Sequence, residues 1–269
     1  MKHLIFPTLL TIATGLNIAF DSKAHSQMMS ACGDVSGLTD AQFASSKSEG
    51  CAQTPEKYEI VIYEMGLCTG ASSPIASGRL DRTNCTATFT KLTGQAVDLA
   101  GSASITLDTS SGSAPSPATY TWGYMVMANT FGLKGSVTTS QSTWRSTSNS
   151  MASKTSNSNI EFTESLTNFD SPPNCDSSGS ASMSLGTMSA ILTDGDLVED
   201  TSCSNVSRLV GAFSPSNSYT ITPSTTALKM TFTVTDNGMS VIPNPSSPFG
   251  VGQFGSGPFQ MEITTIEKT

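Results

Sequence analysis

Residues 51–85 read CAQTPEKYEIVIYEMGLCTGASSPIASGRLDRTNC, and this stretch decides the fold that we predict for the whole chain. Residues 58–65 form a β-branched and aromatic run in which Tyr58, Ile60, Ile62 and Glu64 alternate with Glu59, Val61, Tyr63 and Met65, and this period of two is typical of a strand. Cys68 follows this strand, and a loop rich in Ser, Gly and Pro leads to Cys85, where a Thr-rich strand begins. The stretch therefore predicts two strands whose connecting loop is closed by two cysteines.

The rest of the chain also consists of short alternating segments and turns. We count about ten short alternating segments, separated by turn signals every ten to fifteen residues. Residues 119–128 form the strongest of them, with Tyr120, Trp122 and Tyr124 at alternate positions. The sequence Asp236-Asn237-Gly238 between two alternating segments predicts a hairpin.

These patterns predict an all-β protein with disulfides, in which residues 51–269 form one antiparallel β-sandwich of jelly-roll or Greek-key type. Two smaller sandwiches divided near residues 136–158 are the alternative. Residues 27–50 are polar and form either a mobile arm or an arm with one short helix near residues 40–47, because Thr39 and Gln42 fit a capping box.

The N-terminal 26 residues have the features of a secretory signal peptide. A basic start, an apolar run over residues 4–20 and an Ala-His-Ser ending predict cleavage after Ser26 and a secreted or cell-surface location. A retained membrane anchor is one alternative, although the run is short and polar for a span. A lipoprotein signal that ends at Cys32 is another.

Cleavage after Ser26 would remove both histidines of the chain, His3 and His25. Catalysis by Ser-His-Asp or Cys-His arrangements would then be excluded, as would metal sites that use imidazole. The net charge of −8 argues against nucleic acid and anionic membranes as partners. We expect no membrane span after cleavage.

The six cysteines all lie beyond the predicted cleavage site, and an even number in an exported chain predicts three disulfides. No two of them have the C-x-x-C spacing of redox or zinc sites. Fifteen pairings are possible. Closure of short loops favours Cys32 with Cys51, Cys68 with Cys85, and Cys175 with Cys203.

Four kinds of site remain possible in such a chain. An acidic cluster could bind Ca²⁺ or could be a solvated turn, and its members are Asp194, Asp196, Glu199 and Asp200. Trp144 stands alone in a polar tract and would be a contact residue if it were exposed. Strand carboxylates could act in glycoside hydrolysis, and the candidates are Glu59, Glu64, Asp98, Glu161 and Glu164. The tyrosines and tryptophan of residues 119–128 are either a sugar-binding face or core.

The segments TPEKYEIVIYEMGLCT and ATYTWGYMVM resemble uncharacterised exported β-rich proteins of aquatic bacteria. The resemblance implies export and β structure but no activity. From the residues we expect a non-enzymatic structural or adhesive protein that binds copies of itself, as in an extracellular filament or surface layer. The alternative is a glycan-binding module or a carboxylate-dependent glycosidase that acts on surface glycans. We predict no cofactor other than the Ca²⁺ considered above.

Overall fold

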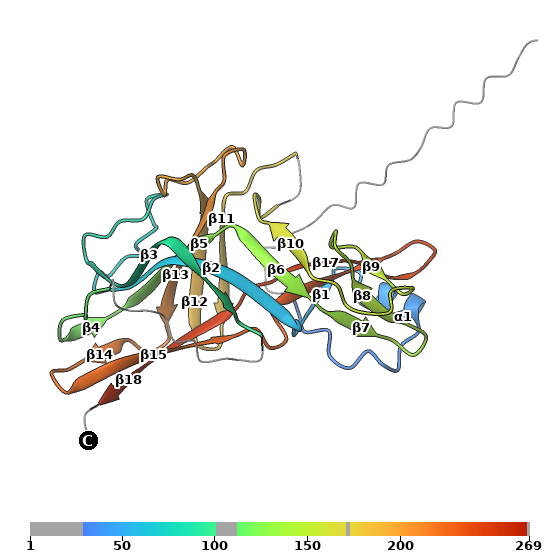
Figure 1. The fold of residues 1–269 in the computed structure, drawn as a ribbon, viewed down its shortest axis with the longest axis horizontal. Helices are drawn as coiled ribbons and strands as arrows, with labels where there is room; N and C mark the ends of the chain where they lie inside the picture. Colours follow the sequence, from blue (N-terminus) through green and yellow to red (C-terminus); the bar gives the residue numbers. More distant parts are fainter. Residues whose placement is uncertain (1–28, 101–111, 171–172, 268–269) are drawn as a thin grey trace, which may run out of the picture.

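The computed structural model describes residues 29–100, 112–170 and 173–267, so the predicted signal peptide lies outside the described residues. These residues form one short helix and eighteen strands (Figure 1). Their bounds are α1 Asp40–Ser46, β1 Cys51–Gln53, β2 Lys57–Cys68, β3 Cys85–Asp98, β4 Ala118–Tyr120, β5 Trp122–Ala128, β6 Thr130–Lys134, β7 Ser136–Thr138, β8 Thr143–Ser146, β9 Ala152–Ser153, β10 Phe162–Ser165, β11 Ser178–Met183, β12 Gly186–Thr193, β13 Arg208–Pro215, β14 Tyr219–Ile221, β15 Thr225–Thr233, β16 Met239–Asn244, β17 Gly250–Ser256 and β18 Gln260–Glu267.

An eight-stranded antiparallel sheet is the largest unit. Its order is β10-β6-β2-β5-β13-β12-β11, and β3 pairs with the other side of β2. The long strand β2 comes from the alternating segment that opens the sequence argument, and it pairs with β3, β5 and β6. Among the described residues, strand β11 pairs with β12 alone, so it is one end of the described sheet.

The sheet divides at Asn129, a buried residue between β5 and β6. β13 pairs with β5 on one side of this point, and β10 pairs with β6 on the other. The Asn129 side-chain amide donates to the carbonyl oxygens of Leu166 and Val206, at 3.2 and 3.5 Å. This one side chain therefore joins the end of β10 to the chain that enters β13.

Smaller sheets cover one face of the large one. They are β1-β16-β17, β15-β18, β14-β4 and β7-β8-β9. One cluster of buried residues extends between the layers from Cys32 to Ile263 and includes Phe43, Phe131 and Phe232. Figure 1 shows α1 with β7, β8 and β9 at one end of the molecule and β14, β15 and β18 at the other.

The loop that Cys68 and Cys85 close covers part of the opposite face. Its Ile75 and Leu80 are buried against a second, smaller cluster that includes Tyr124, Val126 and Val210. The predicted all-β class with antiparallel sheets is confirmed. All three predicted disulfides, Cys32–Cys51, Cys68–Cys85 and Cys175–Cys203, are also present.

The predicted short helix is confirmed as α1. Thr39 accepts from Gln42 N through its side chain, and the Gln42 side chain accepts from Thr39 N, so both halves of the capping box are formed. No helix among the described residues has the length and apolar character that crossing a bilayer requires.

Two predictions of local structure were wrong. The Asn237-Gly238 turn forms, but β15 and β16 on either side of it pair with strands of different sheets, so it does not close a hairpin. The aromatic row is also broken, because the chain leaves strand geometry between β4 and β5. Tyr120 consequently lies in the main core and Tyr124 in the smaller one.

Candidate functional site

An apolar cavity of about 110 Å³ lies between the eight-stranded sheet and the turn that joins β17 to β18. Its floor is one face of β5, β13, β12 and β11, and its roof is residues 256–259. The lining residues are Tyr58, Met127, Phe131, Leu166, Phe169, Gly179, Ser180, Ala181, Met188, Ala190, Leu209, Gly211, Ser256, Gly257, Pro258 and Phe259. We call it the edge cavity, because β11 at the end of the sheet forms one of its walls.

The sheet register explains why the floor is hollow. Met125 lies opposite Gly211, Gly211 opposite Ala190, and Ala190 opposite Gly179, so these four residues form one row across four strands. Residues directly opposite in a sheet project to the same face. The row begins with a long side chain and ends with two glycines and an alanine. Side chains this small cannot fill the space below the roof.

Aromatic rings form the far wall and hold the roof in place. The Tyr58 ring meets the rings of Phe131 and Phe259 edge to face, with centroids 5.7 and 6.1 Å apart. The Tyr58 hydroxyl donates to Gly257 O at 2.7 Å. Burial, together with the nearby charge of Glu164, raises the pKa of Tyr58, so this hydroxyl keeps its proton and the bond.

Glu164 of β10 contacts the same roof from the side. Its Oε2 accepts a hydrogen bond from Ser256 N. Burial raises the pKa of Glu164, and the hydrogen bonds from Ser256 offset part of the effect. The roof therefore lies beside a carboxyl group that ionises less readily than an ordinary glutamate.

The outer edge of β11 is the second feature of the site. Leu192 N donates to Ser177 O, which makes these two residues a hydrogen-bonded pair. Such pairs alternate along an antiparallel ladder, so Ser178, Ser180 and Ser182 direct their backbone N–H and C=O groups away from β12. Ser178 N donates to Asp176 Oδ1 at 3.3 Å, in agreement with this direction.

Comparisons of the chain with protein-family models, with curated proteins and with solved structures found no match in any of the three. The function must therefore be inferred from the contacts of the edge cavity and of the predicted site residues.

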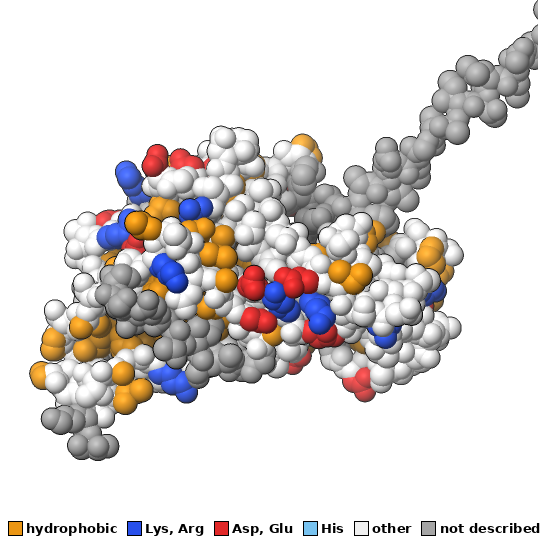
Figure 2. Space-filling view, viewed as in Figure 1, with side chains coloured by type: hydrophobic (Ala, Val, Ile, Leu, Met, Phe, Trp, Pro, Cys, Tyr) orange, Lys and Arg blue, Asp and Glu red, His pale blue; other side chains and the backbone are white. Residues whose placement is uncertain are grey.

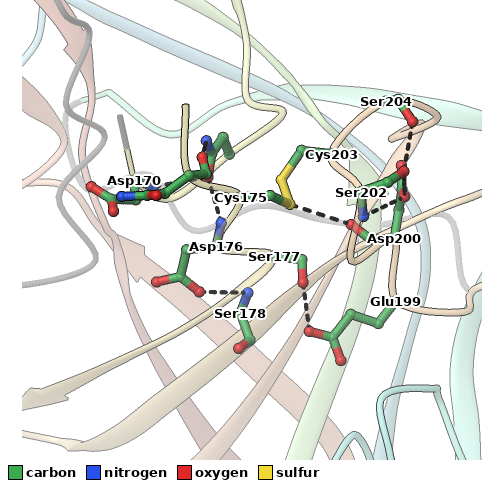
Figure 3. Close-up of a disulfide and its surroundings, with 12 residues drawn as sticks. Asp170, Cys175, Asp176, Ser177, Ser178, Glu199, Asp200, Ser202, Cys203 and Ser204 are labelled. Carbon is green, nitrogen blue, oxygen red and sulfur yellow. Dashed lines mark hydrogen bonds between the residues drawn. A yellow bond between two sulfur atoms is a disulfide. The ribbon is translucent and has the colours of Figure 1, made fainter. Parts of the chain in front are cut away.

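Three of the four carboxylates of the calcium hypothesis, those of Asp194, Glu199 and Asp200, accept hydrogen bonds from separate partners, and Figure 3 shows Glu199 and Asp200. Asp194 Oδ1 accepts from the backbone N–H groups of Asp196 and Val198, so it stabilises its own turn. Asp200 accepts from Ser202, which is the main cause of its lowered pKa, and from Asn205 N. Their neighbour Glu199 accepts from Ser177 Oγ at 2.7 Å (Figure 3).

No group of three or more His, Cys, Asp or Glu residues in the described part of the chain is arranged to hold a metal ion. The carboxylates around the Cys175–Cys203 disulfide instead have the arrangement of solvated turns, each with its own N–H or hydroxyl donors.

Trp144 is only 5% exposed, so it lacks the exposure that a contact residue needs. Its Nε1 donates to Asp40 Oδ1 at 3.1 Å, and Lys154 Nζ lies 5.2 Å from the ring centroid. The local sequence around Trp144 is polar, but Asp40 of α1 is brought to it from about a hundred residues away. The tryptophan is thus part of the core under α1.

The five carboxylates considered for glycoside hydrolysis do not form an acid–base pair in a cleft. Lys57 Nζ lies 3.2 Å from Glu59 and 2.7 Å from Glu161. Figure 2 shows acidic and basic side chains interleaved near the middle of the face that it presents. Asp98 accepts from the backbone N–H groups of Tyr58 and Ala100. Glu164 contacts the roof of the edge cavity, as described above.

Hydrogen bonds from Arg82 and Tyr124 keep Glu64 ionised. Arg82 donates to both of its oxygens, at 2.7 and 2.8 Å, and the Tyr124 hydroxyl donates to Oε1 at 2.6 Å. Burial alone would raise the pKa of Glu64, but the bonds from Arg82 and Tyr124 outweigh it and lower the pKa. A general acid needs the opposite shift.

Proposed function

We propose that this protein is an exported, non-enzymatic structural or adhesive subunit, which associates with other copies by pairing strand edges as in an extracellular filament or surface layer. The three disulfides support this proposal, because they are typical of proteins that fold in an oxidising compartment outside the cytoplasm. Export through cleavage after Ser26 is part of the proposal.

The unprotected edge of β11 is the observation that carries the proposal. Natural sheets protect their edges with charged side chains, proline or bulges. β11 has the sequence SGSASM, which contains neither charge nor proline, and its ladder with β12 runs without a register shift. Ser180 and Ser182 at this edge have exposed side chains. An edge of this kind is suited to accept another strand.

A filament needs a second contact surface, because a single two-fold contact closes on itself. A groove of about 500 Å³ between β18 and the connection from β13 to β14 offers one. Tyr219 and Ile263 line it together with several Ser and Thr residues. It lies beside a strand that also ends a sheet, since β18 pairs only with β15 in the part of the chain that the structure describes.

The test compares the mature protein with the variant Ser180→Pro. Proline removes one outward-facing N–H of β11 without removing a bond to β12. Ser180→Thr keeps this N–H and is the matched control. Sedimentation velocity from micromolar to millimolar concentration, with negative-stain microscopy, should detect assembly by the wild type and by Ser180→Thr, and weaker assembly by Ser180→Pro. A wild type that stays monomeric throughout would contradict the proposal.

A further inference from the structure

The edge cavity has room for a side chain that the chain itself does not supply. A Cβ atom added to Gly211, at the centre of the floor, would meet no atom within 4 Å. The cavity is also lined by β11, through Gly179, which has no side chain, and Ala181, which has a single methyl group. The space therefore reaches the edge at which another strand would arrive.

Met183, the last residue of β11, has the side chain that would fit. It lies on the same face of the strand as Gly179 and Ala181, because their positions differ by two and four residues. It is partly exposed, at the end where β11 turns into β12. β11 therefore lines the edge cavity at one end and has the long, flexible, apolar side chain of Met183 at the other.

We propose that two copies of the protein pair through antiparallel β11 strands about a two-fold axis at Ala181, so that Met183 of each copy fills the edge cavity of the other. This inference rests on the proposed function and specifies its contact. Only the outward-facing Ser178, Ser180 and Ser182 can form the new backbone bonds. The register that places Ser180 opposite the partner subunit's Ser182 also places Gly179 opposite the partner subunit's Met183.

The nearest symmetric alternative leaves the edge cavity unfilled. If Ser180 lay opposite the partner subunit's Ser180, Gly179 would face the partner subunit's Ala181, and the space above Gly211 would stay empty. A buried void forfeits the contacts that a filling side chain would make. Of these two registers, filling of the cavity favours the one in which Gly179 faces the partner subunit's Met183.

Charge also permits this contact. The chain has a net charge of −8, so two copies repel each other over most orientations. β11 itself is uncharged, and the nearest acidic residue before it is Asp176. In the proposed register the two Asp176 residues are ten strand positions apart. At about 3.3 Å per residue this is roughly 33 Å, which exceeds the Debye length of about 8 Å at physiological salt.

Two variants test the cavity contact through the dimer dissociation constant. Met183→Ala removes both filling side chains of a dimer and should raise this constant at least about 100-fold. Gly211→Leu fills the cavity from within and should weaken the dimer similarly, while its melting temperature shows that it folds. The matched control Met230→Ala changes a methionine of β15, which pairs with β18 and not with β11, and should leave the constant unchanged.

Cross-linking tests the register. The two Ala181 residues would form a non-hydrogen-bonded pair with Cα atoms about 4.5 Å apart, within disulfide range. Ala181→Cys should therefore give a covalent dimer on mild oxidation, and Ser180→Cys should not. Cross-linking through Ser180→Cys alone would overturn the register.

The outcomes separate this inference from the proposed function. If the protein assembles and Ser180→Pro weakens assembly, but Met183→Ala and Gly211→Leu behave like wild type, the Met183 contact is wrong and strand-edge assembly stands. If the wild type is monomeric throughout, both are wrong. Stabilisation of Gly211→Leu with unchanged association would make the cavity a plain void and would overturn the contact.

Discussion

Replacing Asp40 by alanine should strongly destabilise the protein, because this one carboxylate joins α1 to the β7–β8 hairpin. Oδ1 accepts from Thr139 Oγ1 at 2.7 Å and from Trp144 Nε1 at 3.1 Å. Oδ2 accepts from Ser142 Oγ at 3.0 Å, and Lys154 Nζ lies 3.8 Å away. Asp40 is only 7% exposed and is the first residue of α1, where a negative charge is favourable.

The expected loss follows from these contacts. A hydrogen bond to a charged group contributes about 1.5–3 kcal/mol, and a buried donor left without a partner costs about 1–3 kcal/mol. Asp40→Ala leaves the Trp144 Nε1 donor without its acceptor, whereas Thr139 Oγ1 can still donate to Ser142 O at 3.2 Å and the Ser142 hydroxyl can turn to water. We therefore expect a loss of about 3–5 kcal/mol, which corresponds to a melting temperature lower by roughly 10 °C for a domain of this size.

Urea unfolding followed by tryptophan fluorescence measures this loss directly, since Trp144 is itself a partner. Asp34→Ala is the matched control, because Asp34 is exposed and bonds to its neighbour Ser36; it should change stability by less than about 0.5 kcal/mol. Asp40→Asn keeps an acceptor oxygen and should fall between the two. Equal stability of Asp40→Ala and Asp34→Ala would refute the reasoning.

The same site predicts a pH dependence of definite sign. Burial alone would raise the pKa of Asp40, but the hydrogen bonds from Thr139, Trp144 and Ser142 and the charge of Lys154 outweigh it and lower the pKa. A carboxyl group with a lowered pKa in the folded state stabilises the protein above its ordinary value of 3.8. The advantage of the wild type over Asp40→Asn should therefore be constant at neutral pH and should shrink as the pH falls below 3.8.

Three further predictions concern other parts of the molecule. Glu164→Gln should become more stable relative to wild type as the pH rises above 4.5, because burial raises the pKa of Glu164 and its ionisation then lowers the stability of the wild type. Denaturant unfolding from pH 4 to 8 measures this difference in stability. A difference that does not change with pH would contradict the raised pKa. Replacing both Cys68 and Cys85 by serine should cost about 3 kcal/mol, the loop-closure value for a separation of 17 residues, by the same assay. The melting temperature in millimolar Ca²⁺ should equal that in EDTA, because Asp194 and Asp200 are engaged in their own turns. A melting temperature several degrees higher in Ca²⁺ would restore the calcium hypothesis.

The features that were predicted correctly are those that neighbouring residues determine. The cap of α1 needs only Thr39 and Gln42, three positions apart. The disulfides close loops with separations of 17, 19 and 28 residues, and short loops close at the lowest entropy cost. Period-two alternation identifies the first half of β2, because Tyr58, Ile60 and Ile62 are buried in the main core while the residues between them are only partly buried.

The features that were missed depend on contacts between distant residues. Trp144 was interpreted from its Ser- and Thr-rich neighbours, whereas its burial depends on Asp40. The edge cavity is formed by Gly179, Ala190 and Gly211, which are 11 and 21 positions apart and share a row only through the pairing of β11, β12 and β13. A shift of one residue in either pairing would remove the row, and no local pattern specifies it.

The same small residues give the molecule two unfavourable features at one place. Gly179 and Ala181 leave space under the roof that Tyr58 and Glu164 hold in position, and the uncharged strand that contains them has a free edge. A protein that functions as a monomer could avoid both the unfilled cavity and the free edge at little cost. A larger side chain could replace Gly211, and one lysine on β11 would protect the edge. A single event, the arrival of a strand with an apolar side chain, fills the space and satisfies the edge together. That coincidence of cavity and edge is why we place the contact between copies at β11.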